Sequence, residues 1–176
     1  ASKVFEHPAY LEVARNAAQF VLDRMTKGNR LYRSFKDSKA NISAFSEDYA
    51  FMIQAFLDLH DASLDPFWID KARDFDSTAR DLFEDEIHGG LFMAPEDDTL
   101  LIAREKIGID NAVPSPNSVA LMNFVRLNHL CGDTDYLDRA RKLTQCFGRQ
   151  MTAGPLAFSE MLRGVDQLLK SQNDQP

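Results

Sequence analysis

The sequence predicts an all-α fold in which tandem αα-hairpins form part of an (α/α)6 toroid, with one small β-hairpin inserted. Two observations predict this fold. A phrase of the form aromatic, aliphatic, acid, any residue, Ala, Arg occurs three times, starting at Tyr10, Trp68 and Tyr136. Each copy opens a helical pattern directly after a turn, so the three phrases mark the starts of three equivalent helices. The helical stretches between them are much more apolar, which indicates a second class of helix that is covered on most sides.

The first expected helix covers residues 8 to about 27, because Pro suits a first helical turn and Gly28 can supply a left-handed cap. Residues 30–45 are expected to form a loop with one short strand. Ser46 is a good N-cap for a second helix that reaches about residue 62. This helix is apolar nearly all round, so we expect it to be an inner helix.

The third expected helix follows Asp65 and Pro66 and runs to about residue 84, with enough charged residues to place it on the outside. Residues 86–104 contain a glycine turn and two short apolar runs around an acidic turn, which predicts the small β-hairpin. So long a connection inside a compact domain is usually functional. Three more helices are expected at residues 115–132, from 133 onward, and 155–171. Residues 1–170 then form one partial toroid, and residues 171–176 form a polar tail.

The repeat covers pairs of helices rather than the phrase alone. Trp68 lies 58 residues after Tyr10, and Tyr136 lies 68 residues after Trp68. The apolar positions of the second helix fall without a gap, at the same offset of 68, on those of the fourth: Ile53, Phe56, Leu57 and Leu59 on Leu121, Phe124, Val125 and Leu127. A solenoid of short repeats would have a shorter period and regular loops. The long, unequal period therefore favours an α/α toroid, of which three hairpins supply about half.

Composition excludes several classes of function. The 176 residues carry 20 Lys and Arg against 27 Asp and Glu, a net charge of −7, so we expect no nucleic-acid partner. Apolar runs are too short for a membrane span, and no signal peptide is visible. Cys131 and Cys146 match no zinc or redox motif, and as free thiols they favour a reducing, cytoplasmic location. No metal-ligand spacing, phosphate loop or nucleophile elbow occurs, so we expect no metal and no cofactor.

Three segments stand out between the expected helices: Ser46–Phe51 (SEDYAF), His88–Phe92 (HGGLF) and Asp110–Ser118 (DNAVPSPNS). In order and spacing, over about residues 46–165, they resemble the C-terminal part of the spermatogenesis-associated protein 20 family of thioredoxin-domain proteins. The resemblance implies a toroid similar to N-acylglucosamine 2-epimerase and six-hairpin glycosidases, of which this chain is the C-terminal portion. It also implies partners: further hairpins and a thioredoxin-like domain, or a self-associating copy. Cys-x-x-Cys is absent here, so redox activity is not carried over.

A site is expected where the N-termini of the inner helices converge, because several positive helix-dipole ends meet there. Asp48, Asp110 and Glu160 are the candidate catalytic carboxylates, since paired carboxylates can flank a glycosidic bond. Asn117 can bind sugar hydroxyls. For Asp48 and Asn117 ordinary helix capping is the stronger interpretation.

Three further residues are candidate substrate-binding groups. Tyr49 and Phe92 can stack on a sugar ring, although an aromatic on an apolar helix is more often part of the core. Arg104 can reach a substrate anion or simply pair with a nearby carboxylate. Of the histidines, only His60 and His129 lie on expected inner helices, both far from the converging N-termini, which disfavours epimerase chemistry.

The sequence thus leaves two hypotheses of different classes open. The chain is part of a carbohydrate-binding or carbohydrate-active toroid with a sugar ligand, or it is a non-catalytic scaffold within a larger thioredoxin-domain protein.

Overall fold

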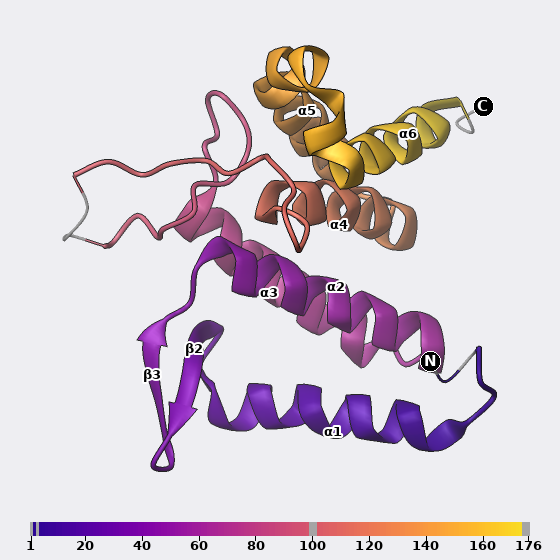
Figure 1. The fold of residues 1–176 in the computed structure, drawn as a ribbon. Helices are drawn as coiled ribbons and strands as arrows, with labels where there is room; N and C mark the ends of the chain where they lie inside the picture. Colours follow the sequence, from indigo (N-terminus) through magenta and orange to yellow (C-terminus); the bar gives the residue numbers. More distant parts are fainter. Residues whose placement is uncertain (1, 3, 99–101, 174–176) are drawn as a thin grey trace.

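A computed structural model describes residues 2, 4–98 and 102–173. The described residues form six α-helices, one short 3-10 helix and one small antiparallel sheet (Figure 1). The helices are α1 (Pro8–Arg24), α2 (Ser46–Ser63), α3 (Phe67–Phe83), α4 (Pro116–Cys131), α5 (Asp135–Ala153) and α6 (Ser159–Asn173), with the 3-10 helix η1 at Pro155–Phe158. The strands are β1 (Thr26–Lys27), β2 (Arg30–Lys36) and β3 (Lys39–Ser43).

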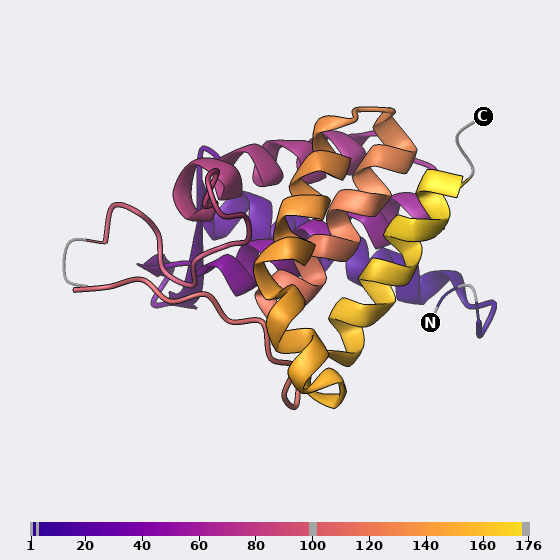
Figure 2. The same ribbon diagram turned by 90° about the horizontal axis from the view of Figure 1, so that it is seen from above.

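The helices alternate between two layers, as the sequence predicts. Helix α4 packs against both α2 and α6, so these three form the inner layer. On the outer side, α3 packs mainly on α2 and α5 mainly on α4, and the layered arrangement is visible from above in Figure 2. Tight turns through left-handed residues join α2 to α3 at Leu64 (φ 58°) and α4 to α5 at Gly132 (φ 70°). The predicted all-α fold of tandem αα-hairpins is therefore confirmed.

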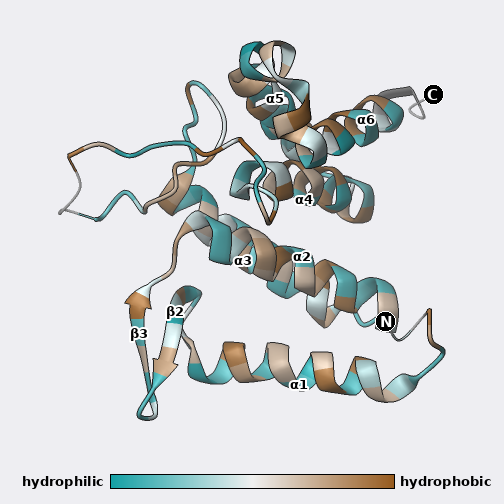
Figure 3. Ribbon diagram, viewed as in Figure 1, coloured by the Kyte–Doolittle hydropathy of each residue, from teal (hydrophilic) through white to brown (hydrophobic). Residues whose placement is uncertain are grey.

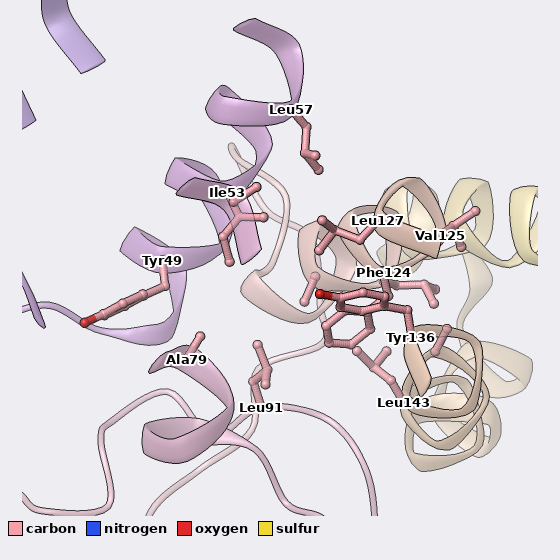
Figure 4. Close-up of a cluster of buried hydrophobic side chains, with 14 of the residues drawn as sticks. Tyr49, Ile53, Leu57, Ala79, Leu91, Phe124, Val125, Leu127, Tyr136 and Leu143 are labelled. Atoms are coloured by element: carbon pink, nitrogen blue, oxygen red, sulfur yellow. The ribbon is translucent and has the colours of Figure 1, made fainter. Parts of the chain in front are cut away.

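Burial explains the difference in composition between the layers. Helix α4 buries most of its residues from Pro116 to Leu127, whereas α3 and α5 present charged residues on the side away from their inner partners (Figure 3). The buried side chains of α2, α4 and their outer partners join in one hydrophobic cluster, part of which is drawn in Figure 4. In that view Leu57 of α2 points toward Leu127 of α4, across the inner layer.

The two complete hairpins repeat the same aromatic pair. Trp68 of α3 stacks on Phe56 of α2, with ring centroids 5.9 Å apart. Tyr136 of α5 stacks on Phe124 of α4 at 6.4 Å. Both members of the second pair lie 68 residues after their counterparts, so the sequence repeat reflects a repeated contact between inner and outer helices.

The structure contains a small antiparallel sheet, but this sheet does not lie at residues 86–104, where the sequence predicts the β-hairpin. The three strands lie at residues 26–43, between α1 and α2, in the order β1-β2-β3. Lys27 pairs with Arg30 in this sheet, so α1 ends at Arg24, and Gly28 (φ 59°) serves the β1–β2 turn instead of capping the helix. The sequence signal for these strands is the brief alternation of apolar and polar side chains from Leu31 to Phe35.

In the predicted hairpin region, the described residues form two irregular arms instead of paired strands. One backbone hydrogen bond, from Met93 N to Glu105 O (2.7 Å), joins the arms, and an isolated bridge links Glu84 to Leu91. Leu100 and Leu101, half of the expected second strand, lie outside the described residues. None of the helices in the described ranges has the length and apolar character that a membrane crossing requires.

Candidate functional site

The three longest or most irregular connections all lead into the N-termini of inner helices. The β2–β3 hairpin precedes α2, residues 84–115 precede α4, and η1 precedes α6 (Figure 1). We call the region around these three N-termini the mouth. Short turns occupy the opposite ends of α2 and α4, where His60 and His129 lie in the last turns. The mouth is therefore where the expected site residues are to be sought.

Asp110 and Glu160 are brought together, but chiefly through the backbone. One oxygen of Asp110 accepts from the Ser115 N–H (2.9 Å) and the other accepts from the Glu160 N–H (2.9 Å). Asp110 thus ties the first turns of α4 and α6 to each other. The Glu160 side chain turns to Arg163, with which it forms an ion pair of 2.6 Å. Capping and the helix dipole account for both carboxylates.

Asn117 is fully buried and holds the connection between α3 and α4. Its side-chain oxygen accepts from the Leu91 N–H (2.7 Å), and its amide nitrogen donates to the carbonyls of Leu91 (3.0 Å) and Ile107 (2.8 Å). Ser115, the N-cap of α4, accepts from the Ser118 N–H (3.1 Å). Because the side chain of Asn117 makes three hydrogen bonds to the backbone of Leu91 and Ile107, it fixes the connection between α3 and α4 against the first turn of α4.

Asp48 and Tyr49 lie in the first turn of α2 and point in different directions. Asp48 accepts from the N–H of Phe45 (2.8 Å), the residue before the helix, and lies 3.7 Å from the Arg33 guanidinium. Burial raises the pKa of Asp48, against the opposing effects of that hydrogen bond and of Arg33. The Tyr49 hydroxyl accepts from Leu31 N (2.8 Å), and its ring is 1% exposed, so Tyr49 belongs to the core.

Phe92 and Arg104 are also brought together. The Arg104 guanidinium lies 4.2 Å from the centroid of the Phe92 ring, and the Lys106 ammonium lies 4.8 Å from it. Arg104 also donates to the Leu82 carbonyl (3.2 Å). Arg104 is the better placed of the two for a ligand, because it lines one of the hollows described next and Phe92 does not.

Two hollows open at the mouth on either side of Phe45. The first, about 460 Å³, is lined by Phe45, Met93, Ala94, Asp98, Ala103, Arg104 and Glu105. The second, about 390 Å³, shares Phe45 and Asp98 and adds Arg30, Ile42, Ser43, Pro95 and Asp97. Each has the size of a small-molecule pocket. The Phe45 ring between them is half-buried, with the Arg33 guanidinium 4.8 Å from its centroid.

Sequence reasoning missed Phe45, Met93 and Glu105 as residues of this region. The only sequence signal for Phe45 is its position directly before the first turn of α2, where it, not Ser46, is the N-cap. A backbone hydrogen bond from Ser46 N to Met93 O (3.0 Å) brings the connection between α3 and α4 onto that turn. Among the residues that the structure describes, no cluster of three or more His, Cys, Asp or Glu side chains is arranged to hold a metal ion.

Known proteins that resemble this chain fall into two groups. Spermatogenesis-associated protein 20 of Rattus norvegicus is 37% identical over 122 residues, which cover 69% of this chain and 16% of that protein. The chain thus spans about a sixth of the length of the relatives it matches. No protein-family model matches it.

The solved structures share the fold at low sequence identity. A family 76 α-mannanase of Bacteroides thetaiotaomicron has a TM-score of 0.75 at 13% identity, over 98% of this chain and 49% of that one. A D-mannose isomerase has a TM-score of 0.70 at 14% identity, over 85% of this chain and 41% of that one. At such identities the likeness shows the fold alone, and these folds match the helical layers described above. Over 69% of its length the chain is therefore a relative of the spermatogenesis-associated protein 20 family, and its fold is part of an α/α toroid.

Proposed function

We propose that this chain is the C-terminal portion of a carbohydrate-binding toroid and that the sugar occupies the hollows beside Phe45. The observation that carries the proposal is the set of groups around them: one half-buried aromatic ring with the charged side chains of Arg104 and Glu105 on one side. Sugars present apolar C–H faces to aromatic rings and paired hydroxyls to charged donors and acceptors. The position of these groups at the N-termini of the inner helices supports the proposal, as do the neighbours named for mannose chemistry.

Hexoses are the substrate class that this region suits best. A volume of about 460 Å³ accepts one or two sugar rings, and the second hollow extends the space past Phe45. The roles of Asp48, Asp110 and Glu160 as catalytic residues remain predictions. Burial raises the pKa of Asp48, which is the direction that a general acid requires.

Thermal-shift measurements on the intact protein test the proposal. The panel is mannose, glucose, N-acetylglucosamine and α-mannobiose, applied to the natural protein and to Arg104→Gln and Glu105→Gln. We expect at least one sugar to raise the melting temperature. Either substitution should raise the Kd for that sugar, obtained from the dependence of the melting temperature on sugar concentration, by about tenfold, because it removes one charged hydrogen bond.

Arg141→Gln is the matched control, because Arg141 is an exposed arginine of α5 that pairs with Asp138. It should leave sugar binding unchanged. Absence of stabilisation by every sugar, or equal weakening by the control, would contradict a carbohydrate site at the mouth.

A scaffold function is the second candidate, and one observation favours it. Helix α1 leaves an apolar surface uncovered, with Tyr10, Val13 and Phe20 all exposed. Such a surface is typical of a helix that packs against further protein. In this case the partner is the rest of a thioredoxin-domain protein or another copy of the chain, and no sugar affects stability.

A further inference from the structure

A small cavity lies inside the core, where α2, α3, α4 and α5 meet, apart from the mouth hollows. About 10 Å³ of it is open to the centre of a water-sized sphere, and every residue around it is 5% exposed or less. Most of its wall is apolar, and four of the apolar residues are labelled in Figure 4: Ile53, Ala79, Leu91 and Phe124. The cavity is therefore closed off from solvent by side chains of both helical layers.

Asn123 of α4 lines this cavity with a polar side chain that is only 1% exposed. Its amide nitrogen donates to the Ala50 carbonyl of α2 (2.8 Å). That contact fixes the orientation of the amide, because the reverse orientation would set two oxygen atoms against each other. Asn123 Oδ1 then has no hydrogen-bond partner among the residues that the structure describes. A buried acceptor without a partner is rare in folded proteins and costs free energy.

Asp76 of α3 and Arg139 of α5 supply the other polar groups of the wall. Arg139 Nη1 and Nη2 donate to the two carboxylate oxygens of Asp76 (2.6 and 3.1 Å). Each terminal nitrogen of a guanidinium carries two N–H groups, and each carboxylate oxygen has more than one lone pair. The pair can therefore make further hydrogen bonds. The same two residues line a polar basin of about 500 Å³ on the outer side of α3 and α5, so they lie between the cavity and that basin.

These groups decide which ligand suits the cavity. A cation would be repelled by the Arg139 guanidinium, and an anion by the Asp76 carboxylate and the Asn123 oxygen. An apolar molecule would leave the Asn123 oxygen unsatisfied. What fits is a neutral molecule of the smallest size that both donates and accepts hydrogen bonds, which is water.

From these observations we infer that the cavity binds one ordered water molecule, which donates to Asn123 Oδ1 and to the Asp76 carboxylate and accepts from an N–H of Arg139. Three hydrogen bonds are the usual number for a buried water molecule. The water joins α4 to the ion pair between α3 and α5. Arg139 Nε extends this network to Glu84 (2.9 Å), where the connection to the mouth begins. The bound water is thus a structural part of the support of that connection.

Nuclear magnetic resonance of the intact protein with 13C-labelled alanine methyl groups tests this inference. Ala50, Ala79 and Ala120 line the cavity, whereas Ala72 and Ala140 are equally buried and do not line it. We expect cross-peaks between the water resonance and the methyl groups of the three lining alanines. Their signs should be opposite in NOESY and ROESY spectra, as for a water molecule that stays bound for longer than the tumbling time of the protein. The two reference alanines should show no such cross-peaks.

Asn123→Leu is the variant that tests the role of the amide oxygen, because leucine has a similar shape and no polar atom. It should abolish the cross-peaks of the three lining alanines. Asn128→Leu is the matched control, since Asn128 is on the same helix, donates to the Asp133 carbonyl and lies outside the cavity. It should leave the cross-peaks unchanged.

An absence of cross-peaks at all three lining alanines in the natural protein would overturn the inference, because the cavity would then be dry. Equal cross-peaks at the reference alanines, or cross-peaks that survive Asn123→Leu, would also overturn it. The first two results are read on the natural protein, so the test stands even if the variant fails to fold. No sugar is added, so failure here leaves the proposed sugar site untouched.

Discussion

Replacement of Asn117 by Ala should destabilise the protein strongly, because Asn117 is a structural residue of the mouth. The substitution removes hydrogen bonds of 2.7, 3.0 and 2.8 Å and leaves the Leu91 N–H and two carbonyls without these partners in a buried place. A buried polar group that loses its partner costs about 1–3 kcal/mol, and the donor costs more than a carbonyl that keeps a second lone pair. We expect a loss of about 3–4 kcal/mol, or roughly 10 °C in melting temperature for a domain of this size.

The assay is urea unfolding followed by circular dichroism, with Asn128→Ala as the control. Asn128 is also on α4, and its amide donates to the Asp133 carbonyl (3.0 Å) in an exposed turn, so its loss should cost below about 1 kcal/mol. Asn117→Asp sharpens the test, because its second oxygen would face two carbonyls. That variant should regain stability as the pH falls and the new carboxyl is protonated. Equal, small effects at Asn117 and Asn128 would refute a structural role and return Asn117 to the ligand-binding candidates.

Three further predictions follow from the other contacts. Arg139 is 5% exposed and pairs with Asp76 (2.6 Å) and Glu84 (2.7 Å). Asp76→Ala should therefore lower the free energy of unfolding by about 3–5 kcal/mol in the same assay. Asp138→Ala, on the surface, should change it very little. Lys106 and the His88 N–H hold the pKa of Asp85 below its ordinary value. The stability that this gives is present above about pH 4 and is lost as the pH falls below it. In urea unfolding across this pH range, Lys106→Met should make the free energy of unfolding depend less on pH, and the exposed Lys170→Met should leave the dependence unchanged. Gly89 and Gly28 both have positive φ, but a Cβ on Gly89 would lie 2.5 Å from the Lys142 backbone. Gly89→Ala should therefore lower the free energy of unfolding by at least about 2 kcal/mol more than Gly28→Ala. Equal losses would show that the backbone around Gly89 moves freely.

The sequence predicts the helical layers well because their signal is periodic and repeated. The phrase that begins at Tyr10, Trp68 and Tyr136 marks the outer helices, and the offset that links Phe56 to Phe124 marks a real contact. The position of the sheet was less predictable. Alternation in β2 is short, and Ile42 in β3 has φ of 61°, a conformation that strand propensity does not anticipate.

The candidate site was harder to predict because its residues act over long sequence distances. Asp110 lies in the expected loop, but its bond to the Glu160 N–H spans 50 residues and could be found only in space. The bonds of Asn117 to Leu91 span 26 residues for the same reason. A carboxylate or amide near a helix start is equally compatible with capping and with ligand binding, and the partners decide between them. Phe45 carried no signal beyond its place before α2.

The most direct test of a sugar site at the mouth is the methyl resonance of Met93 in the intact protein with 13C-labelled methionine methyl groups. Met93 lines the hollow beside Phe45, and Met151, buried on α5, provides an internal reference. On titration with mannose and α-mannobiose, the Met93 methyl resonance should shift with saturation while the Met151 resonance stays in place. An unchanged Met93 resonance at saturating sugar, or equal shifts at both methionines, would contradict a carbohydrate site at this mouth.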